Sequence, residues 1–245
     1  MCDIDHEIRD QFILWLDQLN ISLSNSQLDM FAKYFQMLVE WNKKINLTSI
    51  EDIGGIYIKH FYDSLNMSRM FLNQRLDFDL LDLGTGAGFP GIPMKIVFPD
   101  LKLSLCDSLQ KRVIFLKHVV DQLQLNHVEI IHHRGEVLAR NGQYREHFSN
   151  VVSRAVAKFP VLIELVFPLL KVNGHFFAMK GPKADLEWNE ATRAIDVFYA
   201  ELFGKFLYSL PNELGQRVIY DIVKLKSTSS QFPRRPGEAN RNPII

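Results

Sequence analysis

Residues 78–93 read FDLLDLGTGAGFPGIP, and this stretch decides the fold of the 245-residue chain. A short apolar run ends at Asp82, four glycines follow, and the apolar pattern resumes at Ile92. This order is typical of a buried strand, a tight turn and the start of a helix. Glycine suits such a turn because it adopts positive φ and lets a ligand approach the backbone without meeting a Cβ. The unpaired amides of the turn and of the first helical turn predict a site for a polar ligand.

Two ligands fit this turn on sequence grounds. Gly86, Gly88 and Gly91 match the G-x-G-x-x-G pattern of dinucleotide-binding turns, and Asp107 follows about twenty residues later. Read from Asp82, the stretch is also D-x-G-x-G-x-G, with a carboxylate at the strand end. A pyrophosphate gains nothing from that carboxylate, whereas the amino group and sulfonium of S-adenosylmethionine (SAM) are cations. We therefore prefer SAM to NAD, with Asp107 on the ribose hydroxyls; a merely tight turn is the third interpretation.

Composition and charge restrict the class of protein. With 47% hydrophobic residues, the chain is long enough for one substantial α/β domain with an appendage or for two small domains. No apolar run approaches the roughly twenty residues of a membrane span, and the acidic start differs from a secretion signal. We therefore expect a soluble, cytoplasmic protein. The two cysteines, Cys2 and Cys106, cannot form a disulfide framework, and we expect no metal site.

Net charge does not identify a partner. The 28 basic and 28 acidic residues give a formal charge of zero, so global charge gives no support to nucleic-acid binding. It does not exclude such binding, because contact needs only a local basic face.

The chain divides into three regions. Residues 1–70 predict helices: two apolar stripes flank a polar break at residues 20–26, and a third amphipathic segment runs from about 51 to 67. Residues 71–226 alternate between strands and helices, which favours a mostly parallel, doubly wound sheet. Strands are predicted at 79–83, 101–106, 128–131, 150–153, 175–179, 203–210 and 217–226, with a late helix near 186–199.

The last region, residues 227–245, is rich in Ser and Pro, and we predict neither a helix nor a central strand there. It is either a disordered tail or a basic arm that lies along phosphate or closes over the site. On the phosphate interpretation, deletion of residues 232–245 weakens action on RNA and leaves SAM binding intact.

Polar residues and glycines follow the predicted strands. In an open α/β sheet, ligands bind at the carboxyl ends of the strands, where strand order reverses. The sequence therefore predicts that one rim of the sheet gathers residues 84–89, Asp107 with Ser108, Gly135 with Glu136, Arg154 and Lys180.

Seven blocks of sequence together carry a family resemblance. In their order and separations they resemble the bacterial small-subunit rRNA guanine-N7 methyltransferases, the RsmG or GidB family, over nearly the whole chain from about residue 30. One departure is Gly135, where the family has alanine. The blocks are WNKKINLTS at 41–49, KHFYDSL at 59–65, DLGTGAGFPGIP at 82–93, DSLQKRV at 107–113, VSRAVA at 152–157, MKG at 179–181 and PRRPG at 233–237.

The resemblance implies a class I SAM-dependent methyltransferase: a Rossmann-like, mostly parallel seven-stranded sheet with an N-terminal helical extension. It implies 16S rRNA or the small ribosomal subunit as substrate, and we expect a monomer. Arg154 is expected to bind or orient the substrate, with no certain catalytic residue. The implied cofactor residues are Asp82, Gly84, Gly86, Gly88, Phe89, Asp107, Ser108, Gly135, Glu136 and Arg154, and the candidate RNA contacts are Lys43, Lys44, Lys180, Arg234 and Arg235.

Methylation at guanine N7 fits what the sequence lacks. N7 carries an in-plane lone pair and no proton, so the reaction needs positioning rather than a general base. The chain has no Asn/Asp-Pro-Pro-aromatic block and no Pro-Cys block, which argues against amino-group and carbon-5 methylation. The alternatives are a methyltransferase for another RNA base or a small molecule, an NAD-binding oxidoreductase, and a non-catalytic RNA-binding factor.

Overall fold

The fold is built on one seven-stranded sheet. The computed structural model describes residues 6–71 and 79–245. Strand order is β3-β2-β1-β4-β5-β7-β6; β7 pairs antiparallel with β5 and β6, and the other pairs are parallel. The predicted mostly parallel, seven-stranded sheet is confirmed. The strands are β1 Asp79–Leu83, β2 Lys102–Asp107, β3 Val128–His132, β4 Phe148–Arg154, β5 Leu170–Lys180, β6 Ala200–Ser209 and β7 Gln216–Lys224.

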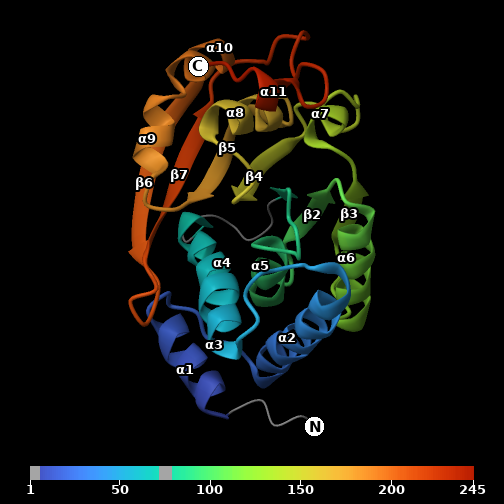
Figure 1. Ribbon diagram of the computed structural model, residues 1–245, viewed down its shortest axis with the longest axis vertical. Helices are drawn as coiled ribbons and strands as arrows, with labels where there is room; N and C mark the ends of the chain where they lie inside the picture. The colour runs from blue at the N-terminus through green and yellow to red at the C-terminus, as the bar shows by residue number, and fades with distance from the viewer. Residues whose placement is uncertain (1–5, 72–78) are drawn as a thin grey trace.

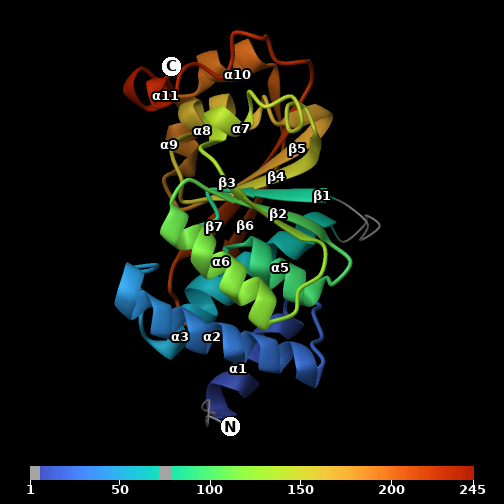
Figure 2. The ribbon, with the colours of Figure 1, turned by 90° about the vertical axis from the view of Figure 1, so that its right-hand side faces the viewer.

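Helices cover both faces of the sheet, as Figure 2 shows. Successive strand residues point to opposite faces, so Leu80 joins one hydrophobic cluster and Leu81 the other. On the face of Leu80 lie α5 Gly91–Val97 and α6 Gln110–Gln122. The opposite face is covered by α7 Gly135–Leu138, α8 Phe159–Val166, α9 Ala184–Asn189, α10 Thr192–Phe198 and α11 Glu238–Arg241.

The N-terminal helices form a further layer over α5 and α6 (Figure 1). Helix α2 begins with a capping box between Ser24 and Gln27 and is capped at its C-terminus by Asn46, which adopts left-handed φ of 49°. The predicted helical extension is therefore confirmed. Its elements are α1 His6–Asp17, α2 Asn25–Ile45, α3 Ile53–Ile56, the π-helix η1 Tyr57–Tyr62, α4 Asp63–Leu65 and the 3₁₀ helix η2 Asn66–Phe71.

Three details differ from the expectations. The amphipathic segment predicted at 51–67 is a chain of short helical pieces around a π-helix. The helix predicted near 186–199 is two helices, α9 and α10. The prediction that residues 227–245 form no helix is wrong at α11, because the four residues after Gly237 contain no proline and Gly237 itself begins the turn with φ of 81°.

No helix among residues 6–71 and 79–245 is long and apolar enough to cross a membrane.

Candidate functional site

The glycine-rich loop between β1 and α5 is fixed from below by Asp82. Its Oδ2 accepts hydrogen bonds from the Thr85 hydroxyl at 2.6 Å and from the Gly91 N–H at 2.8 Å, so one carboxylate ties the loop to the start of the helix. Asp82 is fully buried, and this burial raises its pKa to about 6. Its other oxygen, Oδ1, is buried and has no hydrogen-bond partner among the described residues.

Two glycines of the loop have different surroundings. Gly88 has φ of 99°, and a Cβ there would lie 2.5 Å from Ile92 Cδ1 and 2.7 Å from the Tyr34 hydroxyl oxygen. Gly86 has φ of 63°, and a Cβ there would meet nothing within 4 Å. The Tyr34 hydroxyl also donates to the Ala87 carbonyl. The loop is thus packed against α2 on one side and open to a cavity on the other.

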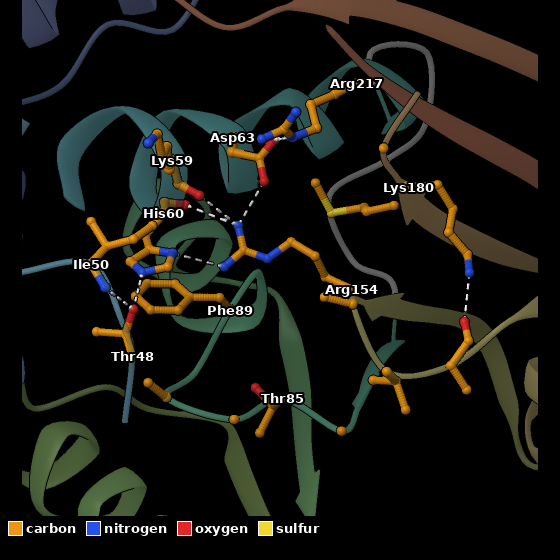
Figure 3. Close-up of a pocket in the computed structure, with 18 of the residues that line it drawn as sticks. Thr48, Ile50, Lys59, His60, Asp63, Thr85, Phe89, Arg154, Lys180 and Arg217 are labelled. Carbon is orange, nitrogen blue, oxygen red and sulfur yellow. Dashed lines mark hydrogen bonds and ion pairs between the residues drawn. The ribbon is translucent and has the colours of Figure 1, made fainter. Parts of the chain in front are cut away.

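That cavity, which we call the large cavity, has a volume of about 720 Å³ and lies between the N-terminal helices and the carboxyl ends of the strands (Figure 3). The loop supplies part of its wall, through residues that include Gly84, Gly86 and Phe89. Although the whole chain is neutral, six basic side chains line this cavity against two acidic ones. The basic residues are Lys59, Arg112, Arg154, Lys158, Lys180 and Arg217, and the acidic residues are Asp63 and Glu187.

Arg154, at the end of β4, lies at the centre of the close-up in Figure 3. Its Nη1 donates to Asp63 Oδ2 at 2.8 Å and to the carbonyl oxygen of Lys59 at 3.3 Å. The guanidinium carbon lies 5.1 Å from the centre of the Phe89 ring. Asp63 Oδ1 accepts from the Tyr208 hydroxyl at 2.8 Å. Arg154 therefore joins three parts of the site: the sheet edge, the π-helix and the loop.

His60 stacks on Phe89, with ring centroids 4.6 Å apart. Its Nδ1 lies 3.4 Å from Arg154 Nη2, and its Nε2 lies 2.8 Å from Thr48 Oγ1. A guanidinium only donates, so Nδ1 is the acceptor and the proton resides on Nε2. Burial and the Arg154 charge lower the pKa of His60 to about 3. His60 is therefore a neutral imidazole with both nitrogens engaged.

Both acids of the large cavity are paired. Asp63 bonds to Arg154, and Glu187 Oε2 accepts from Lys180 Nζ at 2.7 Å. Lys180 also donates to the Ala157 carbonyl oxygen at 2.5 Å. Within the described lining, each of the two carboxylates thus has a cation as its partner.

A smaller cavity of about 270 Å³ lies beyond the ends of β2 and β3. The large cavity and the small one share two wall residues, Gly84 and Val156. A Cβ on Gly84 would lie 2.5 Å from Val156 Cγ2, so Val156 rests directly on the glycine. Five of the sequence-predicted residues line the small cavity, and the structure brings them together with two residues of the C-terminal tail: Gly84, Asp107, Ser108, Gly135, Glu136, Gly237 and Asn240.

Asp107 joins the two cavities by its hydrogen bonds. Oδ2 accepts from the Gly86 N–H at 3.0 Å and from Arg112 Nη1 at 3.2 Å, and Oδ1 accepts from the Leu109 N–H at 2.9 Å. Because a carboxylate has about four acceptor positions, Asp107 keeps room for one more donor. Cys106, next to it, is buried, and that burial raises its thiol pKa to about 12.

The candidate RNA contacts are scattered. Of the five, only Lys180 lines the large cavity. Lys43 lines a separate cavity of about 180 Å³, and Lys44 forms an exposed ion pair with Glu40. Arg234 pairs with buried Glu164, and Arg235 is exposed. Their role as RNA contacts stays a prediction.

Sequence reasoning missed five residues of the large cavity that come from the segment at 57–65 and the β6–β7 hairpin. The block KHFYDSL was a visible signal for three of them, while the pairing of β7 with β5 that brings in the other two is a long-range contact. They are Lys59, His60, Asp63, Tyr208 and Arg217.

Solved structures share this fold. A SAM-dependent methyltransferase from Aquifex aeolicus has a TM-score of 0.52 at 15% identity, covering 73% of this chain and 97% of its own. The TYW2 protein of M. jannaschii, solved in complex with AdoMet, has a TM-score of 0.51 at 14% identity, covering 66% of this chain and 77% of its own. At such identities, the likeness shows the class I methyltransferase fold alone.

Sequence relatives are much nearer. Ribosomal RNA small subunit methyltransferase G of Geobacillus thermodenitrificans is 46% identical over 234 residues, covering 96% of this chain and 98% of the relative. The protein of the same name from Listeria monocytogenes serotype 4b is 45% identical over 236 residues, with the same coverage. A sequence model of the family described as rRNA small subunit methyltransferase G matches residues 27–207. The resemblance read from the motifs is thereby confirmed, and the chain belongs to the rRNA small subunit methyltransferase G family.

Proposed function

We propose that the protein is a SAM-dependent methyltransferase that methylates N7 of a guanine in 16S rRNA of the small ribosomal subunit, in the cytoplasm. Family membership supports the substrate class. The observation that carries the type of reaction is the large cavity, where the glycine-rich loop faces paired acids and a neutral histidine. We expect the enzyme to act as a monomer.

The residues around the two cavities fit SAM. Gly86 leaves space that a Cβ would occupy, and Asp82 Oδ1 is a buried acceptor that an ammonium would satisfy, directly or through one water. Asp107 has an acceptor position left for a ribose hydroxyl. We assign the methionine end to the loop side and the adenosine end to the small cavity. The remaining cofactor contacts of this assignment are Gly84, Phe89, Ser108, Gly135, Glu136 and Arg154, while the predicted contact Gly88 packs against Ile92 and Tyr34 and lines neither cavity.

The chemistry of the cavity suits a nucleophile without a proton. SAM, when bound, supplies a methyl group activated by a sulfonium. Guanine N7 offers a lone pair, so no side chain has to remove a proton before attack. Asp63 and Glu187 are paired, and His60 holds its proton on Nε2. Methylation of an amino group would also require loss of a proton, whereas attack by N7 requires only that the purine is held in line with the methyl group.

Arg154 is a positioning residue in this proposal. It is held by Asp63 and by backbone carbonyls of the π-helix while it lies over Phe89. A cation in this place orients a guanine O6 or a phosphate and is offset by Asp63, so its charge does not oppose the positive charge that develops on the purine. Lys59 and Arg217 line the same cavity and give it affinity for an anionic backbone.

The test is methylation of small subunits or rRNA prepared from cells that lack this activity. The purified protein is incubated with labelled SAM, and the label is mapped by nucleoside mass spectrometry. We expect 7-methylguanosine at one position of 16S rRNA. Label on an amino group or a ring carbon would overturn the assignment to N7, and SAM binding without label on RNA would favour a small-molecule substrate or a non-catalytic role.

A further inference from the structure

The C-terminal tail, residues 227–245, is docked on the body of the protein. Phe232 is buried, and its ring centroid lies 4.6 Å from that of Phe198 in α10. Arg145 donates to the carbonyl oxygens of Thr228 and Phe232, each at 2.9 Å. Arg140 donates to the carbonyl oxygen of Pro233. Burial and guanidinium contacts thus hold the first part of the tail in one place.

An ion pair fixes the middle of the tail to α8. Glu164 is 1% exposed, and its Oε2 accepts from Arg234 Nη2 at 2.6 Å while Oε1 accepts from Arg234 Nε at 3.0 Å. The backbone N–H of Arg234 donates to the same Oε1 at 2.9 Å. A forked, charge-assisted contact of this kind sets both position and orientation. It places the next residues of the tail beside the small cavity.

The tail then becomes a wall of that cavity. Glu136, 6% exposed at the start of α7, accepts from the Gly237 N–H at 2.8 Å. Gly237 and Asn240 line the small cavity together with Asp107 and Ser108. The matched family model ends at residue 207, so this wall lies outside the part of the family that the model describes.

Asn240 differs from its tail neighbour Asn242 in what its carboxamide contacts. The Asn242 Nδ2 donates to Glu238 Oε1 at 2.6 Å, on the surface. Asn240 makes no side-chain hydrogen bond with the residues that the structure describes, although it lines the cavity. A carboxamide presents a donor group and an acceptor side by side, which matches the adjacent N–H and ring nitrogen of adenine.

We propose that the docked tail closes the adenosine side of the cofactor site and that Asn240 is a specificity-determining residue for the purine of the cofactor. This inference rests on the proposed function. Because the tail and the cofactor share a wall, binding of one stabilises the other. Deletion of residues 232–245, which the phosphate interpretation expects to leave SAM binding intact, is now expected to weaken it.

The experiment is isothermal titration of the full chain with S-adenosylhomocysteine and with S-inosylhomocysteine, whose 6-amino group is replaced by a carbonyl. Asn240→Ala is compared with the wild type and with Asn242→Ala, a matched change two residues away that does not line the cavity. We expect Asn240→Ala to lower the affinity for S-adenosylhomocysteine about 3- to 10-fold, as for loss of one hydrogen bond. Its affinity for S-inosylhomocysteine should fall much less. Asn242→Ala should stay within about twofold of wild type for both.

A second measurement does not depend on any variant. Hydrogen exchange of amides 237–241 in the wild type should slow when S-adenosylhomocysteine is added, because the ligand closes on that wall. Unchanged exchange, or equal affinities of Asn240→Ala and wild type for both analogues, would overturn the inference. A wild type that binds neither analogue would instead overturn the proposed function.

Discussion

At the scale of single residues, His60 shows how the site holds a titratable group in one state. Its imidazole is stacked on Phe89 and faces the Arg154 guanidinium, and its pKa is about 3, against 6.5 for an unperturbed histidine. In the unfolded chain the same side chain takes up a proton near pH 6.5. The protonated form therefore favours the unfolded state at acidic pH.

We expect His60 to make stability fall as pH drops. The folded pKa is depressed, so its contribution is complete above about pH 6.5 and is lost progressively as pH falls toward 3. His60→Gln should flatten the fall in the free energy of unfolding between about pH 6.5 and 4, measured by urea denaturation. Asp82 has the opposite effect on stability. Its pKa is raised to about 6 in the folded protein, so its contribution to the free energy of unfolding declines as pH rises from 3.8 to 6.

Asp82 contributes equally to the pH profiles of the wild type and of His60→Gln, so the difference between the two profiles reports on His60 alone. Parallel pH profiles for the wild type and His60→Gln would show that the imidazole titrates normally when folded.

Asp63 is the acid on which the charge balance of the large cavity depends. Its side chain is 6% exposed and that of Arg154 13%. Asp63→Asn would leave a nearly buried guanidinium without its counter-charge, and we expect it to reduce the free energy of unfolding by about 2–4 kcal/mol. Chemical denaturation measures this loss.

The matched control is Glu190→Gln, which breaks the exposed pair with Lys158, where the side chains are 54% and 66% exposed, respectively. That change should cost less than about 1 kcal/mol. Equal losses for the two variants would contradict the importance given to the buried pair.

At the scale of elements, two glycines of the glycine-rich loop have different roles: Gly88 packs against neighbouring side chains, and Gly86 faces the large cavity. Gly88→Ala forces a methyl group against Ile92 and Tyr34 at positive φ, so we expect a clear fall in melting temperature. Gly86→Ala meets no neighbour, so it should cost only the left-handed backbone, about 1–2 kcal/mol, while it weakens SAM binding by filling the cavity wall. Differential scanning calorimetry and titration with SAM measure the two effects; full SAM affinity in Gly86→Ala would contradict the placement of the cofactor.

The strands and the loop were predictable from sequence, because short apolar runs bounded by turn residues and the spacing of glycines are local signals. β1 lies at residues 79–83, as expected. The segment from 51 to 67 was not predictable in detail. In its π-helix, the carbonyl oxygen of Lys59 accepts a hydrogen bond from Arg154, which lies 95 residues further along the chain. Amphipathic spacing does not predict such a long-range contact.

The residues of the candidate site were likewise only partly predictable from the sequence. The residues after β1, β2, β3 and β4 gather at one rim, as the sheet rule requires. Asp82 is the instructive case: the sequence predicts a carboxylate that faces the ligand, whereas the structure places it under the loop, outside the lining of either cavity, with one oxygen used to hold the turn. Its direct contact with the cofactor stays a prediction.

At the scale of the whole molecule, a neutral chain concentrates positive charge at one cavity. Lys59→Ala and Arg217→Ala should each weaken binding to small-subunit rRNA and lower the slope of log affinity against log salt by about one unit for each phosphate that the removed cation had neutralised. Filter binding over a salt series measures this slope. SAM affinity should remain that of the wild type.

Lys171→Ala is the matched control, because Lys171 lies near the start of β5, at the opposite end of that strand from Lys180. Equal salt slopes for the control and for the two cavity variants would mean that RNA binds elsewhere.

The two cavities draw their walls from opposite ends of the chain. Thr48, Lys59 and His60 come from the first third of the sequence, and Asn240 comes from its last residues. A protein emerges from the ribosome N-terminus first, and its domains fold as they appear. The sheet and the glycine-rich loop are thus available during synthesis, yet the small cavity lacks one side until residue 240 has been made. A nascent chain would carry the loop, the helices and most of the sheet and still have an incomplete pocket.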